Sequence, residues 1–262
     1  MRIISVGLGC LLLAACGGGE ASPPLSPPAP IGQTPSETPT PSPTPSATPS
    51  PAPRPTPTYP NPADDGVTVV VAEGDSISVD YSGYYAGYFK LQHPELEYHI
   101  LAVGGSGMDT MVAREETVQK LNPDIVTVFI GANDLGSAPS ARAYFDRLVA
   151  YVTPLRDRGS KVWVATNLPL SIAGNPAYTN NHNALRGPLA DLLKQAVGKQ
   201  IDGVIDFGGD PVMGQLTAPS NGQLYSDGVH PTERSSGLGG HDYLYAIYEQ
   251  AMKQALEDLQ GR

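Results

Sequence analysis

A serine stands where a nucleophile would be displayed. The apolar run at 69–72 ends in Glu-Gly-Asp-Ser, so Ser76 directly follows a turn residue and a carboxylate. A free serine hydroxyl is a weak nucleophile and needs an adjacent general base before it attacks a carbonyl carbon. Ser76 alone is therefore a weak sign of catalysis, and its meaning depends on what else the chain supplies.

The base that fits best is His230, one of five histidines in the chain. Asp227 stands three residues before it, so one turn-like loop can present both side chains to the same cleft. A carboxylate beside an imidazole fixes the tautomer of the ring and stabilises the imidazolium. Standing alone, the same spacing is also typical of an Asx-turn.

Two further stretches carry groups that donate hydrogen bonds to a developing negative charge. Gly-Gly-Ser-Gly at 104–107 permits positive φ and close approach of a main-chain N–H to a ligand, although a tight strand-to-helix turn uses the same residues. Asn133, in Gly-Ala-Asn-Asp, offers a side-chain N–H, although a turn or a helix N-cap is an equally simple use of it.

Short apolar runs predict five strands, at 67–72, 98–103, 125–130, 162–166 and 203–207. Most are rich in β-branched residues and do not alternate, as expected for strands buried on both faces. Helices are predicted between and after them, at 110–120, 141–158, 183–197 and 243–259. Ser140 is the predicted N-cap of the second helix, and Pro154 is expected to kink that helix or end it early. Alternating strands and helices predict a parallel sheet with helices on both faces.

The residues that could do chemistry lie at predicted strand ends. Ser76 follows the first strand, the glycine-rich stretch follows the second, and Asn133 follows the third, while Asp227 and His230 lie near the C-terminus outside any strand. In an open parallel sheet, ligands bind beyond the carboxyl ends of the strands, where the strand order reverses. These side chains are therefore expected to meet at one edge of the sheet.

These motifs, taken in order, resemble the four blocks of the SGNH hydrolases, the GDSL-type esterases and lipases. The blocks are Gly74–Ser76, Ser106–Gly107, Gly131–Asp134 and Asp227–Pro231, and they bracket most of the part of the chain expected to fold. Any one block is unspecific, and the ordered set carries the resemblance. The family resemblance implies a flavodoxin-like three-layer α/β/α sandwich with a five-stranded parallel sheet.

The resemblance also implies roles for the matching positions. Ser76 would be the nucleophile, and His230 would be the base, oriented by Asp227. The main-chain N–H groups of Ser76 and Gly107 and the side chain of Asn133 would form the oxyanion hole. No metal or organic cofactor is needed for this chemistry.

The chain departs from the family pattern at several positions. Ala102 stands where an Asn is common, Met108 follows Ser-Gly where an Asp is common, and Ile77 replaces the usual Leu. These departures leave the oxyanion glycine open between Gly107 and Gly105. The chain contains neither the G-x-S-x-G of ordinary α/β-hydrolases nor the H-E-x-x-H of zinc peptidases.

The N-terminal part of the chain predicts export and a tether. Residues 1–16 read as a bacterial lipoprotein signal that ends in Leu-Ala-Ala-Cys, with Cys16 as the lipidated residue, although an ordinary signal cleaved nearby is the alternative. Of the chain's 27 prolines, 17 fall between 23 and 62, so residues 17–62 are expected to form a disordered Pro/Ser/Thr-rich tether. Residues 63–262 are expected to form one hydrolase domain. Cys10 lies in the signal, so that domain has no thiol.

The charge balance limits the partners. The chain carries 26 acidic and 16 basic residues, a formal charge of −10, without a basic stripe. Nucleic acid is therefore an unlikely fit, and the membrane is expected to be reached through the N-terminal lipid only. The expected location is the periplasmic or cell-surface side of a bacterial membrane, and nothing in the sequence indicates an oligomeric state.

The favoured interpretation is a serine esterase that acts through an acyl-enzyme on short acyl esters, either an O-acylated carbohydrate or a small lipid ester. Tyr81, Tyr84, Tyr85 and Tyr88 follow the nucleophile, and core packing of an amphipathic helix is favoured for them over a sugar- or aryl-binding cleft. The segment 171–181 is expected to be a loop that forms a wall of the cleft.

Three alternatives stay open. The same triad would serve an acyltransferase or a thioesterase. A surface binding module could use the cleft without turnover, although it has no need of all four polar residues. Asp227 and His230 could be metal ligands, but no cysteine or second clustered histidine accompanies them.

Overall fold

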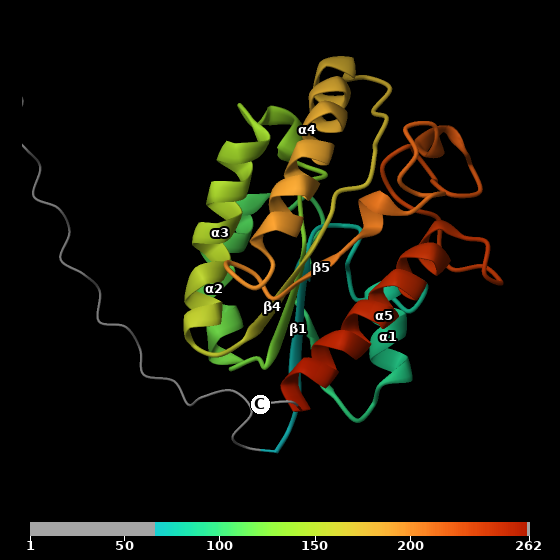
Figure 1. The fold of residues 1–262 in the computed structure, drawn as a ribbon. Coiled ribbons are helices and arrows are strands. Elements are labelled where there is room, and N and C mark those ends of the chain that lie inside the picture. The colour runs from blue at the N-terminus through green and yellow to red at the C-terminus, as the bar shows by residue number, and fades with distance from the viewer. Residues whose placement is uncertain (1–65, 261–262) are drawn as a thin grey trace, which may run out of the picture. The chain divides into compact units, whose positions relative to one another are not determined.

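The computed structural model describes residues 66–260. The expected signal with Cys16 and the expected tether lie outside the described residues, as does the start of the expected domain. Within the described part, one five-stranded sheet is flanked by helices on both faces, which makes a three-layer α/β/α sandwich (Figure 1).

The sheet is entirely parallel, and its strand order is β2-β1-β3-β4-β5. This is the doubly wound, flavodoxin-like order, in which the direction of winding reverses between β1 and β3. All five predicted strands are confirmed, with ends shifted by a few residues. Their bounds are Val69–Gly74 for β1, Glu97–Ile100 for β2, Ile125–Phe129 for β3, Lys161–Ala165 for β4 and Gly203–Ile205 for β5.

The helices divide between the two faces of the sheet (Figure 1). On one face lie α1 at Tyr85–Gln92 and α5 at Gly240–Gln260, and on the other lie α2 at Met108–Lys120, α3 at Ala141–Asp157 and α4 at Pro176–Ala196. Short 3₁₀ turns occur at Leu135–Ser137, Phe207–Gly209 and Ala218–Ser220. None of the helices in residues 66–260 combines the length and the apolarity that crossing a bilayer requires.

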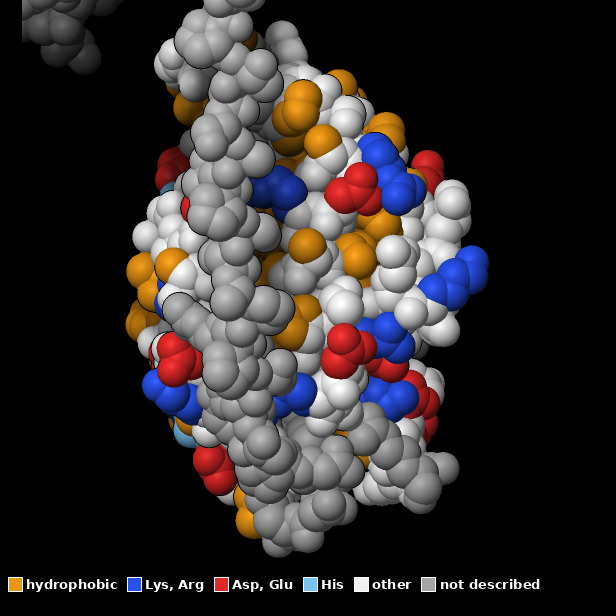
Figure 2. All heavy atoms as spheres, turned by 90° about the vertical axis from the view of Figure 1, so that its left-hand side faces the viewer, with side chains coloured by type: hydrophobic (Ala, Val, Ile, Leu, Met, Phe, Trp, Pro, Cys, Tyr) orange, Lys and Arg blue, Asp and Glu red, His pale blue; other side chains and the backbone are white. Residues whose placement is uncertain are grey.

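Each face of the sheet buries its own apolar core. Val70 and Ala72 of β1 pack toward α1 and α5, whereas Val71, between them, packs toward α2, α3 and α4. Successive side chains of a strand point to opposite faces, so a strand covered on both faces must be apolar at every position. This explains the non-alternating runs in the sequence. On the visible surface over α2 and α3, acidic and basic side chains are interspersed (Figure 2).

Several helix boundaries differ from the prediction. Helix α4 begins at Pro176, so the second half of the segment expected to be a loop at 171–181 is helical. Asn175 caps it by accepting a hydrogen bond from the N–H of Tyr178 at 3.1 Å. Helix α3 continues to Asp157, past Pro154. Ser140 caps α3 as predicted, since its hydroxyl accepts from the N–H of Ala143 at 3.1 Å.

Candidate active site

The structure brings Ser76, His230 and Asp227 into one hydrogen-bonded chain. The Ser76 Oγ lies 2.8 Å from the His230 Nε2, and the Nδ1 of the same ring lies 2.7 Å from the Asp227 Oδ2. The two contacts use opposite nitrogens of the imidazole. A ring held in this way has its proton on Nδ1 and a free lone pair on Nε2, directed at the serine hydroxyl.

The position of Ser76 follows from the end of β1. Gly74 packs tightly against β3, since a Cβ there would lie 2.7 Å from the carbonyl oxygen of Phe129. Asp75 is buried and accepts a hydrogen bond from the N–H of Ile77 at 3.0 Å. Burial raises the pKa of Asp75 to about 6, although the N–H groups of Ile77 and Ala132 act against this rise. Ser76 is thus held in place by the hydrogen bond between the residues on either side of it, Asp75 and Ile77.

The loop that carries His230 is shaped by Asp227. The Asp227 Oδ1 accepts from the N–H of Val229 at 2.9 Å and from the N–H of His230 at 2.8 Å. The Asx-turn and the orienting contact to the ring are therefore made by the same carboxylate. Burial favours a higher pKa, but the N–H groups of His230 and Val229 and the His230 ring hold the pKa of Asp227 below its ordinary value.

Gly228 is required in this loop for two reasons. Its φ is +83°, a left-handed conformation, and a Cβ there would lie 2.3 Å from the carbonyl oxygen of Ser171. The Ser171 N–H donates to the Gly228 carbonyl at 2.8 Å. The segment after β4 therefore supports the loop that carries His230. The part of the segment 171–181 that precedes α4 lies beside the candidate site.

The donor groups lie on the loops after β2 and β3. Asn133 donates from Nδ2 to the carbonyl oxygen of Ser106 at 2.9 Å, which places its amide beside Gly107 at the start of α2. Among the described residues, no acceptor faces the main-chain N–H groups of Ser76 and Gly107. Both are therefore free to donate to a ligand. Gly105 lies in an open part of the loop at φ +77°, where a Cβ would meet nothing within 4 Å.

Asp134 holds this arrangement together, and the sequence reasoning did not single it out. Its Oδ2 accepts from the N–H of Met108 at 2.6 Å, and its Oδ1 accepts from the Tyr144 hydroxyl at 2.7 Å. The carboxylate packs so closely on Gly107 that a Cβ there would lie 2.7 Å from it. The sequence feature that could have pointed to Asp134 is its position next to Asn133. These contacts hold Gly107 close to the Asn133 amide, whereas Gly105 lies in an open part of the loop.

A small apolar cavity adjoins these groups. Its volume is about 10 Å³, close to the space that one water molecule needs. Its lining includes chain neighbours of Ser76, Asn133 and His230. The lining residues are Ile77, Phe129, Ala132, Asn167, Leu168, Pro169, Leu170, His182 and Val229.

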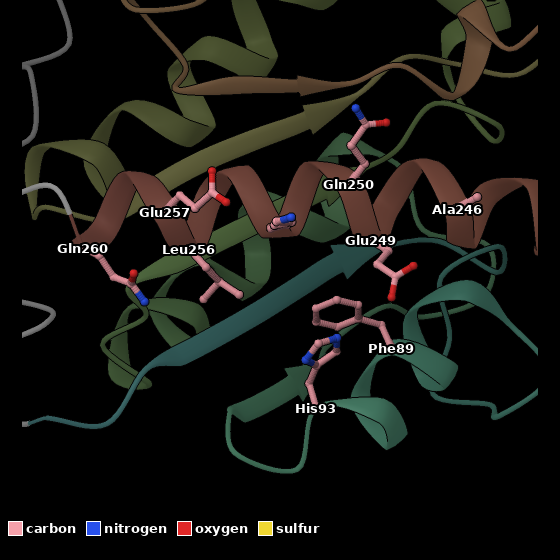
Figure 3. A pocket seen from close by; sticks show the side chains of 9 residues that line it. Phe89, His93, Ala246, Glu249, Gln250, Leu256, Glu257 and Gln260 are labelled. Carbon is pink, nitrogen blue, oxygen red and sulfur yellow. The ribbon is translucent and has the colours of Figure 1, made fainter.

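A larger cavity of about 510 Å³ lies elsewhere, between α1 and α5. Figure 3 shows Phe89 and His93 of the α1 side facing Leu256 and Glu249 of α5 across it. None of its lining residues belongs to the four sequence blocks. Its size does not make it the reactive site, because it offers no nucleophile paired with a base.

The metal-ligand alternative finds no further ligand in the described part of the chain. Residues 66–260 contain no group of three or more His, Cys, Asp or Glu side chains placed to hold a metal ion. Asp227 and His230 are instead bonded to each other, and His230 is bonded to Ser76.

A hydroxyl, an imidazole and a carboxylate joined in this order at the carboxyl edge of a parallel sheet form the arrangement that serine hydrolases use. Residues 72–236 match the model of the GDSL-like lipase/acylhydrolase family. The chain belongs to this family, and it is therefore a hydrolase by family and fold. The match includes all four blocks identified in the sequence.

Solved structures share the fold. A Bacteroides fragilis protein is 24% identical with a TM-score of 0.58, covering 75% of this chain and 91% of its own. A GDSL-like lipase from Bacteroides thetaiotaomicron is 21% identical with a TM-score of 0.56, covering 75% of this chain and 93% of its own. A lipase/acylhydrolase from Enterococcus faecalis is 18% identical with a TM-score of 0.56, covering 72% of this chain and 96% of its own. A search of curated proteins found no match.

Proposed function

We propose that the protein is a carboxylic ester hydrolase that works through Ser76, His230 and Asp227. The observation that carries the proposal is the pair of hydrogen bonds, 2.8 Å and 2.7 Å long, that joins these three side chains. In this mechanism His230 removes the proton of the Ser76 hydroxyl as its oxygen attacks the ester carbonyl. The charged imidazole is then stabilised by Asp227.

The negative charge of the tetrahedral intermediate falls on the former carbonyl oxygen. We assign its stabilisation to the N–H groups of Ser76 and Gly107 and to the Asn133 amide. Asn133 would exchange its hydrogen bond to the Ser106 carbonyl for one to the oxyanion. His230 next gives its proton to the departing alcohol and leaves an acyl-enzyme. Water, activated by the same histidine, releases the acid and regenerates Ser76.

The substrate is proposed to be a short acyl ester of a carbohydrate or of a small lipid. Among the described residues, the cavity next to the loops of Ser76 and His230 measures about 10 Å³, which is too small to bury a long acyl chain. No step in this mechanism calls for a metal or an organic cofactor. We expect the rate to fall as the acyl chain is lengthened from acetate to octanoate.

Transfer to another acceptor is the second candidate for the same triad. The side chains of Asp227 and His230 are 53% and 35% exposed, so the base that would activate water is open to solvent. An acyltransferase would gain from excluding water while its acceptor binds, whereas a thioesterase transfers the acyl group to water as an esterase does. The exposure favours hydrolysis. A binding module without turnover would leave Ser76 without a use.

The location is a separate proposal. The small-residue box that ends on Cys16 and the proline-rich stretch after it support export with a lipid anchor. The protein would then stand on the periplasmic or cell-surface side of a bacterial membrane. Replacing Cys16 by Ser and fractionating the cells tests this, because the variant should leave the membrane fraction. Unchanged membrane retention would contradict the lipid anchor.

The catalytic proposal is tested by Ser76→Ala, assayed on acetate esters. In serine triads, loss of the nucleophile costs on the order of 10⁴- to 10⁶-fold in turnover, so activity should become nearly undetectable. Ser137→Ala, at an exposed serine outside the triad, is the control and should retain full activity. If the purified Ser76→Ala variant keeps more than about a tenth of the rate, the assigned nucleophile is wrong.

A further inference from the structure

Two tyrosines beside the triad are not part of the core. Of the tyrosines after the nucleophile, Tyr85 is buried and begins α1, as expected for helix packing. Tyr81 and Tyr84 precede that helix. Tyr81 is 45% exposed, and Tyr84 is partly exposed. Neighbouring aromatic rings that stay accessible to solvent form an apolar surface that a ligand can use.

The two rings are held rigidly. Tyr84 stacks on the buried ring of His241, with centroids 4.0 Å apart and an interplanar angle of 15°. Tyr81 meets Tyr84 edge to face at 5.2 Å and 84°. A ring fixed by its neighbours loses little entropy when a ligand stacks on it.

The tyrosine segment is tied to the loop that carries His230. The Tyr81 hydroxyl donates to the Glu233 Oε2 at 3.0 Å, and the N–H of Arg234 donates to the carbonyl of Gly83 at 2.9 Å. Partial burial and then the charges of Glu233 and Asp227 raise the pKa of the Tyr84 hydroxyl. The tyrosines therefore lie on the histidine side of the triad.

That side is where the alcohol of an ester must lie. His230 donates its proton to the leaving oxygen, so the alcohol part of the substrate extends past the imidazole. The acyl part points the other way, since its carbonyl oxygen is held by donors on the loops after β2 and β3. The residues around His230 consequently contact the alcohol rather than the acid.

We propose that Tyr81 and Glu233, supported by Tyr84, form a subsite for a sugar ring as the alcohol part of the substrate. This inference rests on the proposed esterase function and narrows it to O-acylated carbohydrates. The C–H face of a pyranose is apolar and its rim carries hydroxyls. An exposed ring with a carboxylate at its edge matches both features, because the ring stacks on the face and the carboxylate accepts from the hydroxyls. A simple alkyl alcohol has no further hydroxyl for Glu233, whereas the rim of a sugar offers several.

The experiment compares acetate esters that share one acyl group. The esters are 6-O-acetyl methyl glucoside, glycerol triacetate, ethyl acetate and acetylcholine, each followed by acid release in a pH-stat. Tyr81→Ala should lower kcat/KM for the sugar ester about tenfold, mainly through KM, and should change ethyl acetate less than about twofold. Tyr81→Phe keeps the ring and should retain most of the sugar activity. Leu91→Ala, at a side chain that is 60% exposed, is the control and should change neither.

Each other result contradicts the subsite. An equal loss on all four esters would show that Tyr81 acts on the fold or on the triad. A loss confined to acetylcholine would show a site for a cationic alcohol, and an unchanged sugar rate would show no subsite. If the wild-type protein hydrolyses none of the esters, the esterase function itself fails, which is distinct from a failure of the subsite alone.

Discussion

Asp227→Asn separates the orienting role of the carboxylate from its structural role. Asp227 accepts three hydrogen bonds, two from main-chain N–H groups on Oδ1 and one from the His230 ring on Oδ2. An asparagine keeps its carbonyl oxygen toward the two N–H groups, since the flipped amide would face them with N–H donors. Its NH₂ then points at the His230 Nδ1.

The consequence is a change of tautomer. Facing an N–H donor, the Nδ1 of His230 must accept, so the ring proton moves to Nε2. That nitrogen lies 2.8 Å from the Ser76 Oγ and can no longer take the proton of the hydroxyl. In a comparable serine triad this substitution lowers kcat about 10⁴-fold, which corresponds to about 5.5 kcal/mol of transition-state stabilisation. The two retained hydrogen bonds should keep the melting temperature within about 2 °C of the wild-type value.

The assay is single-substrate kinetics on an acetate ester, with the melting temperature measured on the same preparation. Asp146→Asn is the matched control, because Asp146 is exposed on α3 and pairs only with Arg142 at the surface. It should change the rate less than about twofold, since such surface pairs contribute little. If Asp227→Asn remains folded and loses less than about tenfold while Ser76→Ala is inactive, the tautomer argument is refuted.

Three further predictions concern the surroundings of the triad. Asn133→Ala should lower kcat about 10²- to 10³-fold with little change in KM, and a loss seen mainly in KM would argue against an oxyanion role. Gly228→Ala should lower the melting temperature by about 5 °C, because a Cβ would clash with the Ser171 carbonyl at positive φ, whereas Gly174→Ala, in open space, should not. Burial lowers the pKa of His241 to about 3, below its ordinary value, so its stabilising contribution is present above about pH 6.5 and is lost as the pH falls. The free energy of unfolding should fall by about 1.4 kcal/mol for each pH unit in this range. His241→Gln should reduce this fall when urea unfolding is measured at a series of acidic pH values. An unchanged fall in the variant would show that His241 is not its cause.

The strands were predictable because burial on both faces leaves an uninterrupted apolar run. The start of α4 was missed for a reason that lies in the sequence itself. Asn175 followed by Pro176 is a cap followed by a first-turn proline, a known start signal, but the segment has little apolar periodicity there. Pro154 was expected to disturb α3, yet the helix continues, because packing of its buried face outweighs one missing hydrogen bond.

The candidate site was predictable as a set of residue types, and its geometry was not. Order and spacing placed Ser76, Asn133 and His230 near one edge of the sheet. Nothing in the spacing shows that Asp134 ties the loop after β3 to the start of α2, since that contact depends on how two loops meet in space. Nor does it show that Tyr81 is exposed while Tyr85 is buried, since the helix starts between them.

Asp75 lies where the strand order of the sheet brings two loops of the candidate site together. It follows β1 and accepts from the N–H of Ile77 at 3.0 Å, and the N–H of Ala132, after β3, also acts to lower its pKa. β1 and β3 lie on either side of the point where the winding reverses, so the carboxylate lies between the loop of Ser76 and the loop of Asn133. A buried carboxylate is costly, as its raised pKa reflects, but without it the N–H of Ile77 would lack its acceptor. We therefore expect Asp75 to help hold Ser76 at its distance from Asn133.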